Sequence, residues 1–227
     1  MKNLVIAVVL IAGALMCASC SRLVHWAQQT VPQVEKITLD ISPACAYVRT
    51  LQLYNQFTTV ALFDVLRLSD TVRTVYAELY SLEHCKSEEL ATLFLRRQLQ
   101  ENAYFISFYV LMPQTKENSI SFGDQPGMWS LCLWVDGLAY TPQEVKTVEL
   151  APEYRRIFGN RYNRFKVPYL VRFDANDIQG RPIVRPTTSK IKLCFTSAHY
   201  SISTCWPLTP VSEDKSTAQL CHTRSTF

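Results

Sequence analysis

The chain of 227 residues has very little net charge and few histidines. It contains 23 basic and 19 acidic residues, which gives a formal net charge of +4 at pH 7. A nucleic-acid-binding domain usually carries a strongly basic patch, so this small balance argues against a nucleic-acid partner. With only four histidines, few general bases are available to activate a nucleophile.

The sequence motifs of the common enzyme classes are also absent. There is no G-x-S-x-G, no H-E-x-x-H, no Walker loop and no dinucleotide-binding fingerprint. The mature part of the chain has no C-x-x-C spacing, which argues against a zinc ribbon or a thioredoxin-like redox site. We therefore expect no cofactor and no metal site, name no catalytic residue, and favour a non-enzymatic protein over an enzyme.

The N-terminus carries the clearest signal. Lys2 gives a positive start, and residues 4–16 form a run without any charged or polar side chain. An apolar core of about 7–15 residues is typical of a secretory signal, whereas a membrane-spanning helix needs about 20. The small residues Ala18 and Ser19 directly precede Cys20. This arrangement resembles the lipobox of bacterial lipoproteins, in which a cysteine thiol receives a diacylglyceryl group and becomes the new N-terminus.

The resemblance implies that Cys20 is lipidated, with Cys17 as the rival position. Met16 stands where a small residue is expected before Cys17, which makes it the poorer match. Ser21, in place of an aspartate, implies retention at the outer membrane, facing the periplasm. The alternatives are an ordinary secretory signal cleaved near the same cysteine and an uncleaved anchor. All three export the domain, so the membrane is the first expected partner and an envelope protein the second.

The resemblance and the composition together predict four segments. These are a signal peptide (1–19), a lipid-anchored tether (20–43), a β-sandwich domain with a helical insertion (44–210) and a C-terminal tail (211–227). The mature chain is long enough to bury one sizeable core.

The hydrophobic pattern changes its period along the domain. Helical spacing predicts two helices at about 70–102, the first capped by Ser69 or Asp70 and the second starting after Ser87. Short apolar or alternating runs predict strands in 47–66, 104–112, 129–135, 144–150, 165–174, 190–195 and 202–208. This pattern favours a mainly β fold, an antiparallel immunoglobulin-like sandwich with the helices as an insertion.

The last two strands suggest a disulfide. If they form a hairpin that places Leu193 opposite Trp206, the same register places Cys194 opposite Cys205. Directly opposed side chains in an antiparallel ladder lie about as far apart as a disulfide needs. Disulfides suit an exported protein, so we predict a contact between these two cysteines. The pairing of Cys45, Cys85, Cys132 and Cys221 is left open.

Residues 154–173 interleave basic and aromatic side chains. Arginine beside aromatic rings suits binding to phosphate, carboxylate or ring faces. The alternative is that the aromatics fill the core while the arginine stems lie over them. The basic residues that carry the binding hypothesis are Arg155, Arg156, Arg161 and Arg164.

Three weaker patterns have structural interpretations that we prefer. His84-Cys85 is the one adjacent cysteine–histidine pair, but adjacent side chains usually diverge. A metal site using His199 would have to join the tip of a hairpin to thiols on its strands. Residues 174–180 resemble a calcium loop only faintly, because Ile178 occupies a ligand position.

The sequence thus predicts a membrane-tethered envelope lipoprotein that acts as a non-enzymatic structural or interaction module. The alternatives are an envelope hydrolase with an unrecognised site and a binder of an anionic ligand through residues 154–173.

Overall fold

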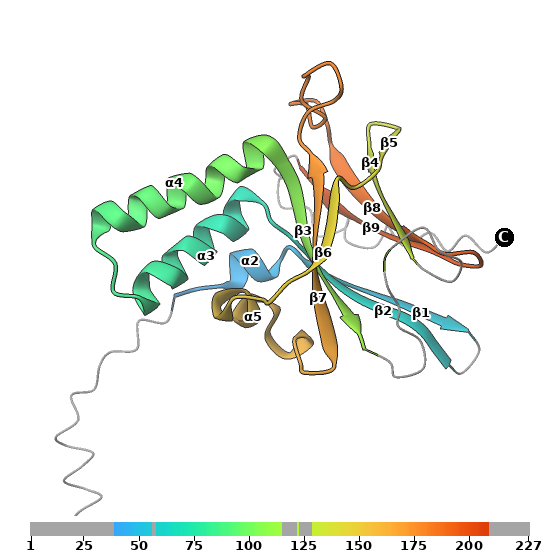
Figure 1. The fold of residues 1–227 in the computed structure, drawn as a ribbon, viewed down its shortest axis with the longest axis horizontal. Helices are drawn as coiled ribbons and strands as arrows, with labels where there is room; N and C mark the ends of the chain where they lie inside the picture. The colour runs from blue at the N-terminus through green and yellow to red at the C-terminus, as the bar shows by residue number, and fades with distance from the viewer. Residues whose placement is uncertain (1–38, 56–57, 115–121, 123–128, 209–227) are drawn as a thin grey trace, which may run out of the picture. The chain divides into compact units, whose positions relative to one another are not determined.

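A computed structural model describes residues 39–55, 58–114, 122 and 129–208 (Figure 1). The chain divides into two compact units, Met1–Leu39 and Asp40–Phe227. All helices and strands described below belong to the second unit. The signal peptide, the lipidation positions Cys17 and Cys20, most of the tether and the C-terminal tail lie outside the described residues, so those assignments stay predictions.

Two antiparallel sheets form the body of the second unit. The larger sheet has the order β1-β2-β3-β7-β6, and the smaller has the order β5-β4-β8-β9. The strands of the larger sheet are β1 (Val48–Asn55), β2 (Thr58–Arg67), β3 (Phe105–Pro113), β6 (Glu144–Thr147) and β7 (Lys166–Asp174). Those of the smaller sheet are β4 (Ser130–Val135), β5 (Leu138–Tyr140), β8 (Lys190–Thr196) and β9 (Ser201–Pro207). The predicted strands are therefore confirmed, and β5 is an addition to them.

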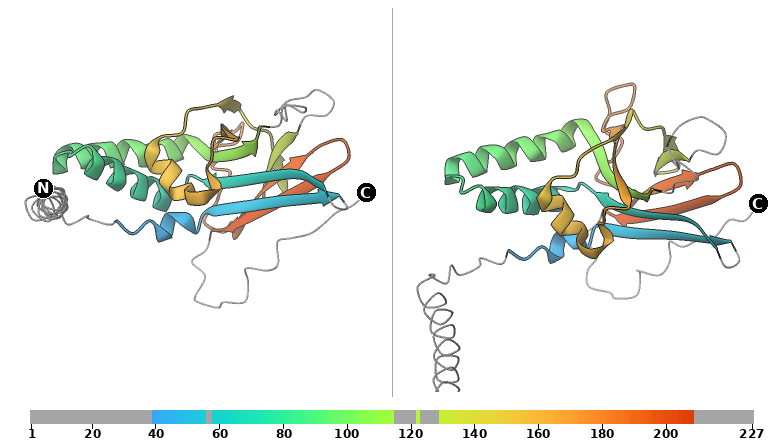
Figure 2. Two further views of the ribbon diagram at one scale, coloured as in Figure 1. Left: turned by 90° about the horizontal axis from the view of Figure 1, so that it is seen from below. Right: turned by 60° about the horizontal axis from the view of Figure 1, so that its bottom comes forward.

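The predicted pair of helices is also confirmed, as α3 (Asp70–Glu83) and α4 (Glu88–Tyr104). They connect β2 to β3, which are hydrogen-bonded neighbours, so they are an insertion between two adjacent strands. Ser69 caps α3 by accepting a hydrogen bond from the Val72 amide at 3.4 Å, and Ser87 caps α4 in the same way. Figure 2 shows the two helices running side by side away from the strands.

Three further short helical segments lie outside this insertion, and the sequence analysis did not predict them. They are α2 (Ser42–Cys45), α5 (Pro152–Phe158) and η1 (Gly159–Arg161). The last two occupy the start of the stretch rich in arginine and tyrosine, before β7 begins.

The main core lies between the two sheets. Phe63 of β2 stacks on Phe195 of β8, with ring centroids 4.4 Å apart. Phe108 of β3 packs against Trp206 of β9 at 5.3 Å. The apolar side chains of the alternating strands therefore point from both sheets into the space between them, as a sandwich-like arrangement requires.

The other face of the larger sheet is covered by helices. Tyr109 of β3 meets Tyr154 of α5 with ring centroids 4.9 Å apart, and Leu111 beside it is fully buried. This explains why residues 104–112 are apolar at nearly every position. The fold is therefore a mixed α/β arrangement of two antiparallel sheets and several helices. The immunoglobulin-like connectivity stays a prediction.

The predicted register of the last hairpin is wrong. Cys194 lies opposite Ser203, and Cys205 lies opposite Lys192, two residues away from the predicted pairing. The hairpin closes instead through a hydrogen bond from the Ser197 amide to the Tyr200 carbonyl at 2.8 Å. A slip by two residues keeps every side chain on its face, so hydrophobic alternation does not distinguish the two registers. Cys194 is a free thiol and does not pair with Cys205.

Candidate functional site

A cavity of about 480 Å³ opens where the insertion joins the larger sheet. Five segments meet around it: the end of β2 with the start of α3, the end of α4 with the start of β3, the β7–β8 loop, the end of β9 and a residue before β1. The residues that line it are Tyr47, Arg67, Leu68, Ser69, Asp70, Thr71, Asn102, Ala103, Phe105, Ile106, Ser107, Ala175, Asn176, Pro182, Val184, Pro207 and Leu208. This volume suits a small ligand or a single side chain of a partner.

Arg67 is the cation of this cavity. It is the last residue of β2 and is partly buried. Burial lowers the pKa of its guanidinium, while electrostatic interactions with Tyr47 and Asp70 act in the opposite direction. Within the described ranges its side chain makes no hydrogen bond and no ion pair. An arginine remains protonated even when desolvated, so the cavity holds a positive charge that no described residue engages through a hydrogen bond or an ion pair.

Ser107 adds a polar group without a partner. The residue is only 2% exposed, and its hydroxyl has no hydrogen-bond partner among the residues that the structure describes. Most buried hydroxyls are hydrogen-bonded, so this one is unusual. Arg67 lies opposite Phe108 in the β2–β3 ladder, so the side chain of Ser107, one residue earlier, points to the other face of the sheet.

Asp70, the acidic residue of the cavity, already accepts a hydrogen bond from a neighbouring side chain. Asp70 Oδ1 accepts a hydrogen bond from Asn102 Nδ2 at 2.6 Å, and Asn102 Oδ1 accepts one from Arg73 Nε at the same distance. Arg73 itself is paired with Glu101 at 3.2 Å. This chain of contacts connects α3 to α4 at the cavity wall. Asp70 acts on Arg67 through its charge and forms no ion pair with it within the described residues.

None of the described residues that line the cavity is a histidine or a cysteine. Its carboxylate is that of Asp70, which accepts a hydrogen bond from Asn102. Across the described part of the chain, no group of three or more histidine, cysteine or acidic side chains is placed to hold a metal ion. The described helices also include none that is long and apolar enough to cross a membrane.

The four arginines predicted from the sequence contact different partners. Arg155 pairs with Glu149 at 3.2 Å, and Arg156 pairs with Glu83 of α3. The salt bridge of Arg156 connects α5 to α3, whereas that of Arg155 stays within the segment that leads into α5.

The remaining two arginines are less engaged. Arg161 donates a hydrogen bond to Thr50 Oγ1 at 3.2 Å, and Arg164 lies over the ring of Phe165, 4.8 Å from its centroid. Neither forms an ion pair within the described residues. The structure therefore divides the stretch 154–173 into paired and unpaired arginines, and none of the four lines the cavity.

The weaker patterns have structural contacts. His84 ends α3, stacks near Tyr80 at 4.3 Å and lies 3.8 Å from the buried carboxylate of Glu153. The loop that resembles a calcium site is a polar turn, because Asp177 accepts hydrogen bonds from the amides of Gln179 and Arg181 at 2.8 and 2.9 Å. These interactions agree with the structural interpretations.

Sequence reasoning missed the cavity residues. Arg67 is the last residue of a mainly apolar strand and comes shortly before the helix cap Ser69. In the sequence, such a position looks like the solvent-exposed end of a strand. The comparison with known proteins adds no assignment: no protein-family model, no curated protein and no solved structure matches this chain.

Proposed function

We propose that this protein is a membrane-tethered lipoprotein of the bacterial envelope, a non-enzymatic interaction module that binds an anionic group of a partner at Arg67. The partner is an envelope protein that presents a carboxylate-bearing segment. The single observation that carries the proposal is a guanidinium that makes no hydrogen bond and no ion pair within the described residues, in a cavity of about 480 Å³.

The chemistry of the cavity favours a carboxylate or phosphate oxygen. A guanidinium presents several N–H donors in a planar fork that matches such oxygens. Hydrogen bonds to charged groups are stronger than neutral ones, so an anionic oxygen bound at Arg67 gains a charge-assisted contact.

The tether supports a role at a membrane. The N-terminal resemblance implies that two or more acyl chains hold the domain at the membrane, and stable anchoring takes at least two such signals. A tethered domain meets membrane-bound partners at a raised local concentration, so a modest affinity is sufficient.

The enzyme alternative has less support. A hydrolase needs a nucleophile and a base within hydrogen-bond reach, and no hydrogen bond among the described residues joins a hydroxyl of the cavity to the carboxylate of Asp70. An interaction module needs only shape and charge, which the cavity provides.

A thermal-shift titration tests the binding proposal. The full-length protein in detergent micelles is titrated with succinate, inorganic phosphate and N-acetylglutamate amide. At a ligand concentration ten times Kd, binding stabilises the folded state by about 1.4 kcal/mol. For a chain of this size that corresponds to a rise in Tm of roughly 3–6 °C.

Two variants separate the cavity from general charge effects. Arg67→Gln is expected to abolish the ligand-dependent rise in Tm. Arg164→Gln removes an exposed arginine over Phe165 and is expected to leave the rise unchanged. An equal rise in the wild type and in Arg67→Gln would contradict the proposal, as would the absence of a rise with all three anions.

A further inference from the structure

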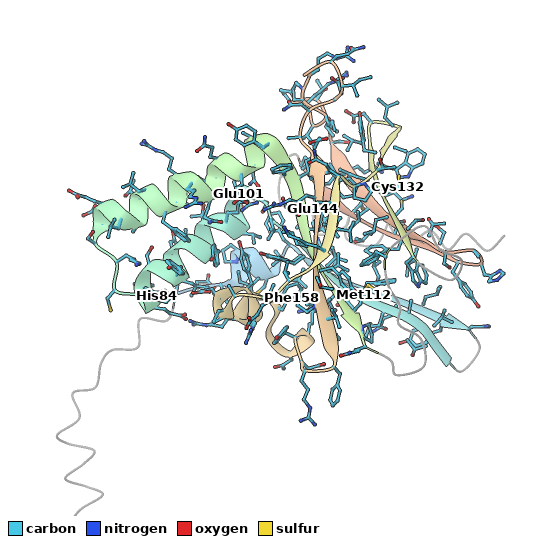
Figure 3. All side chains as sticks on the ribbon, in the orientation of Figure 1. His84, Glu101, Met112, Cys132, Glu144 and Phe158 are labelled. Carbon is cyan, nitrogen blue, oxygen red and sulfur yellow. The ribbon has the colours of Figure 1, made fainter. Side chains whose placement is uncertain are left out.

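Two cysteines lie directly opposite each other in the smaller sheet. Strands β4 and β8 are antiparallel neighbours, and their register places Cys132 of β4 opposite Cys194 of β8. The flanking pair, Leu133 and Leu193, is buried in the core between the sheets. Because side chains alternate along a strand, both thiols point to the outer face of the smaller sheet. Cys132 is labelled in Figure 3.

This placement matches the geometry of a disulfide. Directly opposed residues of an antiparallel pair have Cα atoms about 4.5 or 5.5 Å apart, depending on their place in the hydrogen-bond pattern. Disulfides join Cα atoms about 4.4–6.8 Å apart, so both values are in range. Cys132 and Cys194 can therefore be joined with little movement of the backbone.

The two thiols lie opposite each other but differ in how accessible they are to solvent. Both are free thiols, and burial is the main cause that raises the pKa of each. After burial, Lys192 lowers the pKa of Cys194 and Cys132 raises it, as expected for residues that lie opposite each other in the sheet. Cys194 is only 8% exposed, whereas Cys132 is half-buried. An external oxidant therefore reaches Cys132 first.

We propose that Cys132 and Cys194 form a cross-strand disulfide when the protein meets a disulfide oxidant. The Cys132 thiolate attacks one sulfur of the oxidant and displaces its first thiol, which leaves a mixed disulfide. The Cys194 thiolate then attacks the Cys132 sulfur and displaces the second thiol. Two thiols of the protein are oxidised, one disulfide of the oxidant is reduced to two thiols, and the two protons pass to those leaving groups.

The bond stabilises the contact between β4 and β8. It closes a loop that runs from Cys132 through β5, β6, α5 and β7 to Cys194. Closing so long a loop restricts the unfolded chain, so we expect a clear rise in Tm on oxidation. The inference is independent of the cavity at Arg67, and failure of either proposal leaves the other standing.

Oxidation of the purified full-length protein tests the inference. The reduced protein is incubated with oxidised glutathione, blocked with iodoacetamide, digested and analysed by mass spectrometry. The expected product is one cross-linked species that contains Cys132 and Cys194 and lacks two hydrogen atoms. Cys85 is an exposed free thiol and serves as the internal control for labelling.

Single variants test the order of the two steps. Cys194→Ser is expected to accumulate a glutathione adduct at Cys132, because the resolving thiol is gone. Cys132→Ser is expected to leave Cys194 unmodified in the folded protein. Equal adducts at the two positions would contradict the proposed order.

The stability readout uses a double variant. Oxidised wild type is expected to melt about 5–15 °C above the reduced form, whereas Cys132→Ser/Cys194→Ser is expected to show a much smaller difference. Full iodoacetamide labelling of Cys132 and Cys194 after oxidation would overturn the inference. A dominant link between either residue and a different cysteine would overturn it as well.

Discussion

The buried ion pair between Lys166 and Asp64 gives the sharpest test of how residues 154–173 are used. Asp64 of β2 is 1% exposed, and Lys166 of β7 forms a salt bridge with it. Asp64 also accepts a hydrogen bond from Thr50 Oγ1 at 2.6 Å. Lys166 belongs to the stretch rich in basic and aromatic residues, so its role decides whether that part of the stretch is structural.

We predict that Lys166→Met destabilises the fold strongly. The substitution removes the partner of a buried carboxylate, and breaking such a pair costs about 3–5 kcal/mol. The hydrogen bond from Thr50 remains and does not replace the lost charge. A change of about 4 kcal/mol moves the urea midpoint by about 2 M if the m-value is about 2 kcal/mol/M.

The control is the double variant Asp64→Leu/Lys166→Met. Replacing both partners by apolar side chains removes the unpaired charge, and such replacements are often neutral or stabilising. We expect it to recover most of the lost stability in urea unfolding followed by tryptophan fluorescence. A Lys166→Met variant within about 1 kcal/mol of the wild type, or a double variant no more stable than the single one, would refute the reasoning.

Two further predictions concern aromatic side chains. The ring centroid of Phe63 lies 4.4 Å from that of Phe195 and 5.1 Å from that of Trp129. Phe63→Ala is therefore expected to lower the free energy of unfolding in guanidinium by about 3–5 kcal/mol. A loss below about 1 kcal/mol would contradict the place of Phe63 in the core. Burial raises the pKa of Tyr76 from 10.0 to about 12. The unfolded chain therefore releases this proton first, and stability falls as the pH rises from 10 to 12. Tyr76→Phe is expected to reduce the slope of unfolding free energy against pH in that window, and an unchanged slope would argue against the assignment.

The sequence predicted the elements of the domain better than their pairing. Alternation and helical spacing located the strands and the α3–α4 insertion because both are local properties of the chain. The register of β8 and β9 depends on the turn at Ser197–Tyr200, and a period of two cannot detect a slip of two residues.

The residue that lies opposite Cys194 could not be predicted either, because it belongs to a strand that is distant in the sequence. The parity argument correctly placed Cys194 and Cys205 on one face, but the residue opposite Cys194 on its other side is Cys132, in a strand far away in sequence. No local pattern indicates which strands become neighbours. The helix α5 was missed although Pro152 and Glu153 are typical of a helix start.

The cavity could not be predicted because five separate segments form it. Arg67 and Ser107 are far apart in the sequence, and both border the cavity only because β2 and β3 are neighbours in the sheet. Their lack of partners is a property of the folded chain. The class of module and its export stay predictions from the sequence, whereas the residues that border the cavity are known only from the structure.

The most direct test of the account is photo-crosslinking in the membrane. A photoreactive phenylalanine analogue replaces Asn176, an exposed residue at the cavity, in the full-length lipidated protein. The account predicts a specific envelope protein in the crosslinked product, and it predicts that this product is lost with Arg67→Gln and retained with Arg164→Gln. An equal yield of the same product in both arginine variants would contradict the central claim that Arg67 binds the partner.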